Sequence, residues 1–208
     1  MRIAIYTLGC KVNQYETQAM GQELLRRGHT LVPFEDAADG YIVNTCSVTA
    51  VSDKKSRQMI RRCKKLNPAA VVAACGCYVQ THPDEAASLD IDLIAGTGDR
   101  MAFLDLFEQA AEEKRPLTLL DDALRRREFE LLPAGGMAQR TRAMLKVEDG
   151  CVNFCTYCII PYARGPVRSL PKTAAVAQTA QLRQEGYREL VFTGIEISSW
   201  GHDLKNGE

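Results

Sequence analysis

Short apolar runs alternate with amphipathic stretches over the first half of the chain. The runs are Ile3–Thr7, Tyr41–Asn44, Val71–Ala74 and Leu93–Ala95. Brief β-type runs that alternate with helical patterns are typical of a parallel sheet covered by helices. We therefore expect an open α/β sheet with helices on both faces.

Three of the intervening stretches have the apolar spacing of helices. The first is expected to be capped by Asn13 and to stop at Gly28, a common residue after a helix end. The second runs from about Ser52 to Leu66 and is ended by Asn67-Pro68. The third spans Met101–Glu113, with its apolar side chains on one face.

The periodicity is lost between Asp121 and Arg142, where charges are mixed and Pro133-Ala134-Gly135-Gly136 occurs. We place a linker at residues 133–142, between a first domain of residues 1–132 and a second unit of residues 143–208.

The second unit resumes the alternation with a strand at Ala143–Val147, a helix at Thr173–Glu185 and a strand at Leu190–Thr193. This is the opening of a repeating (β/α) barrel or open sheet. Few residues follow, so we expect an incomplete barrel with an unpaired strand edge. We also expect such a fragment to bind cofactors better than it turns over substrate.

Three cysteines lie within eight residues of the predicted loop after Val147. They form a C-x3-C-x2-C pattern, called here the second cysteine set: Cys151, Cys155 and Cys158. A structural zinc site generally takes four protein ligands, and no histidine or fourth cysteine lies nearby. Three thiolates on one loop suit an iron–sulfur cubane that keeps one iron open.

Three further cysteines each follow a predicted parallel strand. They are called the first cysteine set: Cys10, Cys46 and Cys77. The carboxyl ends of such strands converge on one crevice, so these thiols are expected to meet. We assign Cys63 and Cys75 to packing, with Cys75 as the substitute if Cys77 is not a ligand.

Composition and charge argue against a membrane-spanning or secreted protein and against a global attraction to polyanions. The formal net charge is zero, with 26 basic and 26 acidic residues, so no global field favours a polyanion. No apolar run reaches the roughly 20 residues of a membrane span, and the start of the chain lacks the pattern of a secretory signal. Thiols are kept reduced in the cytosol, and we expect a cytoplasmic protein with cysteine ligands rather than disulfides.

The residues around both cysteine sets resemble the radical S-adenosylmethionine methylthiotransferases. The stretch from Asp149 to Ser169 is similar to the signature of that family, and Leu8–Glu16 is similar to its opening. The clade that acts on N6-threonylcarbamoyladenosine in tRNA is the most similar. Glu148 and Glu196 depart from the pattern, where glutamine and an uncharged polar residue are expected. Further matches are Asn44-Thr45-Cys46, Gly76-Cys77-Tyr78, Gly96–Arg100 and Thr193-Gly194.

This resemblance implies two [4Fe-4S] clusters, one on each cysteine set, and S-adenosylmethionine (SAM) as a cofactor. The cluster of the second set would reduce SAM to a 5′-deoxyadenosyl radical, which removes hydrogen from C2 of the modified adenine at tRNA position 37. The cluster of the first set would supply a methylated sulfur, and the product carries a 2-methylthio group. Tyr157, Thr193 and Gly194 would lie beside the cofactor, and no acid–base residue is assigned.

The implied partners are a tRNA anticodon stem-loop and an electron donor such as a flavodoxin or ferredoxin. Arg164 and Arg168, inside the signature, are our candidates for tRNA phosphate contacts. A second basic group follows one predicted helix: Lys54, Lys55, Arg57, Arg61, Arg62, Lys64 and Lys65.

Other functions stay open at this point. Within the superfamily, the substrate could instead be isopentenyladenosine in tRNA or an aspartate of a ribosomal protein. Outside it, the cysteines would suit an iron–sulfur electron carrier or a zinc-stabilised module that binds nucleic acid. A carrier normally has four cysteine ligands for each cubane and no open iron.

Overall fold

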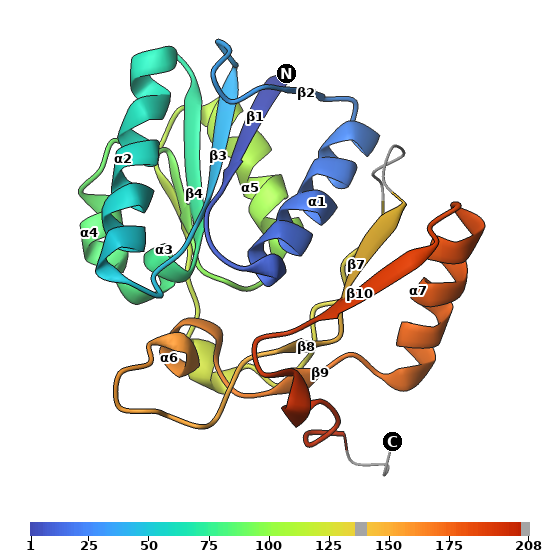
Figure 1. Ribbon diagram of the computed structural model, residues 1–208. Helices are drawn as coiled ribbons and strands as arrows, with labels where there is room; N and C mark the ends of the chain where they lie inside the picture. Colours follow the sequence, from blue (N-terminus) through green and yellow to red (C-terminus); the bar gives the residue numbers. More distant parts are fainter. Residues whose placement is uncertain (136–140, 205–208) are drawn as a thin grey trace.

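A six-stranded, fully parallel sheet forms the larger part of the molecule (Figure 1). The computed structural model describes residues 1–135 and 141–204, so residues 136–140 of the expected linker and residues 205–208 of the second unit lie outside the described residues. The strand order is β2-β1-β3-β4-β5-β6. The bounds are Arg2–Thr7 for β1, Thr30–Val32 for β2, Gly40–Thr45 for β3, Val71–Gly76 for β4, Leu93–Ala95 for β5 and Leu117–Leu119 for β6.

Helices cover both faces of this sheet, which confirms the predicted fold class. The long helices α1 and α5 pack on one face through Met20, Leu24 and Phe103, and α2 packs on the other through Met59, Ile60 and Cys63. The central strands are buried on both faces, which explains why they read as continuous apolar runs. The bounds are Lys11–Arg26 for α1, Ala50–Leu66 for α2, Cys77–Thr81 for α3, Pro83–Ala87 for α4 and Arg100–Glu113 for α5.

Two details differ from the sequence prediction. Strands β2 and β6 have only three residues each and are partly exposed, so they lack the apolar run that marks the other strands. Asn13 does not cap α1: Cys10 is the N-cap residue, and Asn13 is buried in the first turn. Its amide donates to the carbonyls of Leu8 and Thr45, at 2.8 and 2.9 Å.

The smaller part contains a parallel pair, β7 and β10, and a short antiparallel pair, β8 and β9. Helix α7 packs on β7 through Leu182, and Tyr15 of α1 joins the same apolar cluster. The carbonyl of Leu132 accepts from the hydroxyl of Tyr15 at 2.8 Å and from the side chain of Gln178 of α7 at 2.9 Å, which ties the two parts together. The bounds are Arg142–Lys146 for β7, Glu148–Asp149 for β8, Ile160–Arg164 for α6, Arg168–Ser169 for β9, Lys172–Gln184 for α7 and Glu189–Thr193 for β10.

Short 3-10 helices, η1 at Ala123–Arg125 and η2 at Ile197–Ser199, complete the described elements. None of the helices within residues 1–135 and 141–204 combines the length and apolar character needed to cross a bilayer.

Candidate functional site: two cysteine sets at the sheet edge

The first cysteine set lies at the carboxyl edge of the sheet. Cys10 caps α1 after β1, Cys46 follows β3, and Cys77 is the first residue of α3 after β4. Cys10 is exposed, whereas Cys46 and Cys77 are buried. Helix α6 and the loop before it lie below this same edge in Figure 1, and α6 contacts α3.

The three loops of the first set approach one another. A Cβ atom built on Gly9 would lie 3.1 Å from the sulfur of Cys46, so the Cys10 loop touches Cys46 directly. Burial raises the pKa of the Cys77 thiol, and the neighbouring Cys46 adds to that effect. Within the described residues no three His, Cys, Asp or Glu side chains surround a single metal-ion position. The ligands of a cubane are spread over different irons, so they do not converge on one point.

Asn13 connects these loops through its hydrogen bonds. The sequence pattern had predicted it only as a helix cap. Its amide group bonds the carbonyls of Leu8 and Thr45, the residues next to the Cys10 and Cys46 turns. Its Oδ1 lies 3.7 Å from the sulfur of Cys10, which donates to it. Its backbone carbonyl accepts from the side chain of Asn44 at 3.1 Å.

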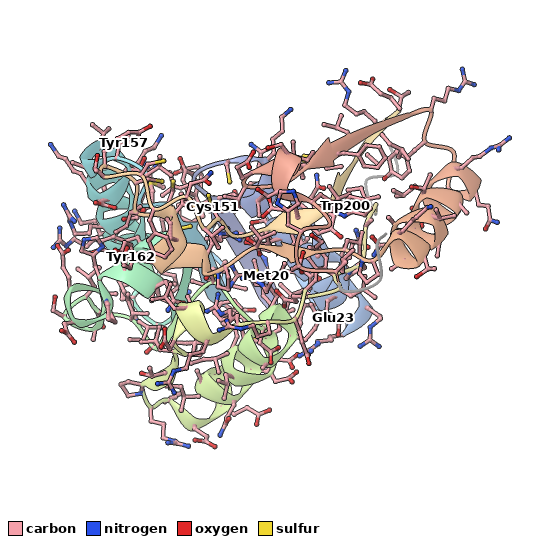
Figure 2. The ribbon with its side chains drawn as sticks, turned by 90° about the horizontal axis from the view of Figure 1, so that it is seen from below. Met20, Glu23, Cys151, Tyr157, Tyr162 and Trp200 are labelled. Atoms are coloured by element: carbon pink, nitrogen blue, oxygen red, sulfur yellow. The ribbon has the colours of Figure 1, made fainter. Side chains whose placement is uncertain are left out.

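The second cysteine set occupies an irregular loop between β8 and α6. The amide of Cys151 donates to the carbonyl of Gly165 at 3.0 Å, and the amide of Cys158 donates to the carbonyl of Cys155 at 2.9 Å. Cys155 is exposed, and Cys151 and Cys158 are partly exposed. In Figure 2, Cys151 lies farther in, while Tyr157 stands at the outer edge of the molecule and is 91% exposed.

Gly150 sets the entry to this loop. Its φ is +99°, and an added Cβ would lie 2.1 Å from the carbonyl oxygen of Pro166. Only glycine adopts this conformation beside so close a backbone group without strain. The chain direction at Cys151 therefore depends on this residue.

The expected cofactor residues Thr193 and Gly194 lie against Glu148. The amide of Val147 donates to the carbonyl of Thr193 at 2.9 Å, and a Cβ on Gly194 would lie 2.7 Å from Oε2 of Glu148. That carboxyl is buried and accepts from the amide of Glu196 at 2.8 Å, but its Oε1 has no partner among the described residues. Burial raises the pKa of Glu148 to about 7.

Arg164 and Arg168 are not on the surface. Arg164 is fully buried and Arg168 is 3% exposed. Both pair with Asp149, and Arg168 also donates to the carbonyls of Arg164 and Pro166, each at 2.8 Å. The sequence expectation of phosphate contacts at these two residues does not agree with their placement, because their charged groups are satisfied within the protein.

These arginines belong to a buried ionic network that joins the two parts. Glu16 of α1 pairs with Arg100 at 2.9 Å, with Lys146 at 3.6 Å and, more closely, with Arg164. Burial would raise the pKa of Glu16, but these three cations together hold it at about 2. The same balance lowers the pKa of Asp149, which Lys146, Arg164 and Arg168 surround.

The two remaining cysteines are interior residues, in agreement with the expectation of packing. Cys63 and Cys75 are fully buried, and burial raises the pKa of Cys63 to about 12 and that of Cys75 to about 11. Cys63 donates to the carbonyl of Met59 at 3.3 Å.

Both sets fit an anionic iron–sulfur cluster in the chemistry of their donors. Each offers three thiols with no disulfide among them. At the first set, Nε of the buried Arg164 has no hydrogen-bond partner among the described residues, and its guanidinium lies close enough to Cys77 to oppose the effect of burial on that thiol's pKa. A thiolate-bound cluster would give this cation a counter-charge.

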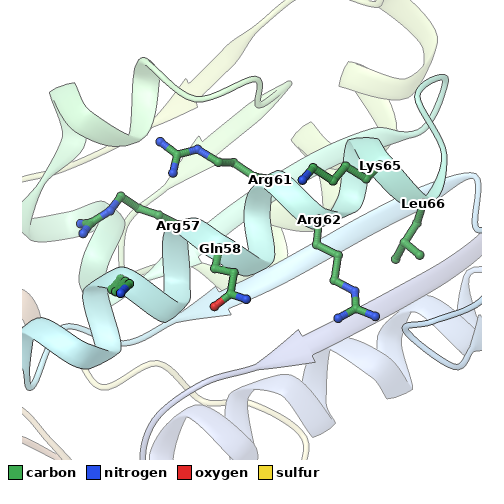
Figure 3. Close-up of a pocket in the computed structure, with 7 residues that line it drawn as sticks. Arg57, Gln58, Arg61, Arg62, Lys65 and Leu66 are labelled. Atoms are coloured by element: carbon green, nitrogen blue, oxygen red, sulfur yellow. The ribbon is translucent and has the colours of Figure 1, made fainter.

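The exposed face of α2 carries most of the second basic group. Figure 3 shows a groove along this helix, and the groove is lined by Lys54, Arg57, Gln58, Arg61, Arg62, Lys65 and Leu66. Arg57 pairs with Glu85 at 3.1 Å, and Arg62 pairs with Glu35. Lys54, Arg61 and Lys65 are exposed and make no ion pair within the described part of the chain.

Known proteins similar to this chain fall into two related groups. Residues 2–96 match the family described as "Uncharacterized protein family UPF0004". The chain is 44% identical over 205 residues to the threonylcarbamoyladenosine tRNA methylthiotransferase MtaB of Bacillus subtilis, covering 98% of this chain and 46% of that protein. It is 39% identical to MtaB of Aquifex aeolicus, covering 98% and 50%.

A tRNA-2-methylthio-N(6)-dimethylallyladenosine synthase of Thermotoga petrophila is 31% identical over 213 residues, covering 100% of this chain and 46% of that protein. The chain thus spans about half the length of the curated relatives it matches. Similarity to methylthiotransferases extends over nearly all of the chain, including both cysteine sets.

Proposed function

We propose that this chain, whose residues 2–96 match the UPF0004 family and which is similar to the MtaB-type enzymes over nearly all of its length, acts in tRNA methylthiolation. The reaction would place a methylthio group on C2 of N6-threonylcarbamoyladenosine at position 37. The partners are the anticodon stem-loop and an electron donor such as a flavodoxin or ferredoxin, in the cytoplasm.

One observation carries this proposal: two sets of three cysteines lie at one end of the molecule and are linked by a buried network. The first set would hold one [4Fe-4S] cluster and the second set another, each leaving an iron without a protein ligand. When bound, these clusters and SAM supply the one-electron chemistry and the sulfur that the new carbon–sulfur bond requires.

The protein's own residues position and shield these groups. Cys46 and Cys77 are buried, so two of the three thiols of the first set are shielded from water, whereas Cys10 and the second loop are open to it. Tyr157 and the turn at Thr193-Gly194 are the residues we assign to the SAM site. The ring of Tyr157 is exposed, so it is open to a ligand, and the missing side chain of Gly194 leaves its backbone close to Glu148.

The substrate assignment rests on similarity. The identity to the threonylcarbamoyladenosine enzymes reaches 44%, against 31% for the dimethylallyladenosine enzyme. Nucleoside mass spectrometry of tRNA from a strain lacking the gene tests this. We expect the 2-methylthio form of threonylcarbamoyladenosine to disappear, and its persistence with loss of another methylthiolated product would contradict the assignment.

Cluster content is the direct test of the chemistry. After anaerobic reconstitution we expect two clusters per chain by iron and acid-labile sulfide. Replacing either cysteine set by alanine should remove one cluster and leave the other. SAM should alter the electron paramagnetic resonance spectrum of the second cluster only. Zinc uptake without iron would favour a zinc-stabilised module. An electron paramagnetic resonance spectrum that SAM does not change would favour an electron carrier.

The basic face of α2 is the surface that we assign to RNA. Lys54, Arg61 and Lys65 repeat at helical spacing over about 16 Å, at a rise of 1.5 Å per residue. Ser56, on the same helix, donates to the carbonyl of Cys46 at 3.0 Å, so the row begins beside the first cysteine set. A row of unpaired cations that leads to the reactive end suits a phosphate backbone.

Binding of a tRNA transcript at several salt concentrations tests this surface. Replacing Lys54, Arg61 and Lys65 by glutamine should weaken binding and reduce its salt dependence. A matched triple variant, Lys114→Gln with Arg183→Gln and Arg188→Gln, removes the same charge from exposed cations elsewhere and should bind like the parent. Equal losses in both variants would contradict a local RNA surface.

A further inference from the structure

Arg164 connects the segment that carries the second cysteine set to the helix that follows Cys10. It ends α6, six residues after Cys158, and its side chain is fully buried. Its guanidinium contacts Glu16 of α1 and, at 3.3 Å, Asp149 at the start of the second loop. One side chain of the smaller part thus reaches into the sheet domain.

The same guanidinium bonds the residue that joins the loops of the first set. Nη2 of Arg164 donates to Oδ1 of Asn13 at 2.6 Å. That same oxygen accepts from the sulfur of Cys10, and the amide of Asn13 holds the turn before Cys46 through Thr45. Helix α6, which ends at Arg164, also contacts α3, whose first residue is Cys77, so all three loops of the first set connect to this end of α6.

The buried cations of the network leave one donor that a cluster could satisfy. Four cations, Arg100, Lys146, Arg164 and Arg168, face the carboxylates of Glu16 and Asp149. Two further buried or nearly buried carboxyls lie beside them: Glu130 accepts from the amide of Arg100, and Glu148 lies near Arg168. Among these cations Arg164 is placed toward the first set, and its Nε has no partner among the described residues.

We propose that Arg164 is a positioning residue for the cluster of the first cysteine set, anchored to the loop of the second. It would fix Asn13, and through it the Cys10 and Cys46 turns, while its charge stabilises the anionic cluster beside Cys77. The inference rests on the proposed function, because it requires a cluster at the first set. The stability of the first-set cluster would then depend on Arg164, a residue that follows the second cysteine set in the chain.

The test uses the 208-residue chain in two backgrounds, each keeping one cysteine set and carrying alanine at the other. In the background that keeps the first set, Arg164→Met should lower resistance of the cluster to an iron chelator by about 10- to 100-fold, the usual effect of losing an outer-shell partner. The reduction potential should become more negative, because a nearby positive charge is lost. Arg164→Lys restores the positive charge but not the planar, two-pronged hydrogen bonding of the guanidinium. It should recover the reduction potential more fully than the resistance to the chelator.

Arg168→Met is the matched control, since it removes a buried cation that pairs with Asp149 but has no hydrogen bond to Asn13. It should leave the potential of the first cluster unchanged. Asn13→Ala keeps the ion pairs and should weaken the first site even if Arg164→Met fails to fold. Unchanged iron in Asn13→Ala, or equal losses for Arg164→Met and Arg168→Met in both backgrounds, would overturn the inference. A parent background without iron would refute the proposed function, and this inference with it.

Discussion

The two cysteine sets solve the same problem of gathering three thiols in opposite ways. The second set is local: its members lie within residues 151–158 on one partly exposed loop. The first set is spread over residues 10–77, and its members follow three parallel strands that lie side by side. The local set depends on the conformation of one loop, whereas the distributed set depends on the whole sheet and on the buried network beneath it.

The network should dominate the stability of the distributed set. Glu16→Gln keeps the shape of the side chain but leaves Arg100, Lys146 and Arg164 short of a counter-charge in the interior. Removing one partner of a buried ionic cluster typically costs about 3–5 kcal/mol, and we expect a loss of that size in the free energy of unfolding by denaturant. Glu113→Gln, which breaks an exposed pair with Arg115, should change it by less than about 1 kcal/mol. Similar losses in the two variants would mean that the network is not what holds the parts together.

The local set should respond most to its entry turn. Gly150→Ala places a Cβ against the carbonyl of Pro166, so we expect a loss of about 1–3 kcal/mol from strain and reduced iron at the second set. Gly186→Ala is the matched control, because Gly186 also has positive φ, +92°, but open space around its Cβ position. Iron at the first set should be unchanged in both variants. A drop there after Gly150→Ala would show that the two sites are less separable than their geometry suggests.

The buried carboxyl of Glu148 should make the stability of the protein depend on pH. Its pKa is raised to about 7 from an ordinary value of 4.5, so the folded state prefers the neutral carboxyl. The stabilising contribution is complete below about pH 4.5 and is lost as the pH rises toward 7. Glu148→Gln should therefore stabilise the protein at pH 8, by about 1–3 kcal/mol, and have little effect at pH 4.5. Thermal melts at the two pH values check this, with the exposed Glu112→Gln as control; an equal shift at both pH values would contradict the buried charge as the cause.

The smallest effect is expected at a cysteine that belongs to neither set. Cys63→Ala removes a buried sulfur and should cost about 1 kcal/mol, similar to the loss of one buried methylene group. Iron content should remain at the parent value, whereas Cys46→Ala should lose the first cluster. Loss of iron in Cys63→Ala would require a different ligand assignment.

Much of the fold could be predicted because the main strands and long helices have strong local patterns. Val71–Ala74 and Leu93–Ala95 are apolar enough to mark strands, and Asn67-Pro68 ends α2 as expected. Strands β2 and β6 could not be found, because three partly exposed residues on the outer edges of a sheet need little apolar character.

Only part of the candidate site could be predicted from the sequence. The cysteines stand out by type and spacing, but the partners of Asn13 and Arg164 are set by tertiary contacts across 151 positions of chain. Arg164 and Arg168 were predicted to contact phosphate because they lie near the second cysteine set and inside the family signature, and their burial depends on pairing with Glu16 and Asp149. The clue in the sequence was that acidic residues occur inside both motifs, at Glu16 and Asp149.

The bond between Arg164 and Asn13 also bears on how such proteins can be recombined. A chimera that takes its sheet domain from one parent and its second loop from another would combine Asn13, Glu16 and Arg100 of the first with Lys146, Asp149 and Arg164 of the second. Parents that place these six groups differently would yield hybrids with mismatched interiors, however well each half suits its own parent. Engineering by module exchange should therefore treat the six residues as one inherited unit.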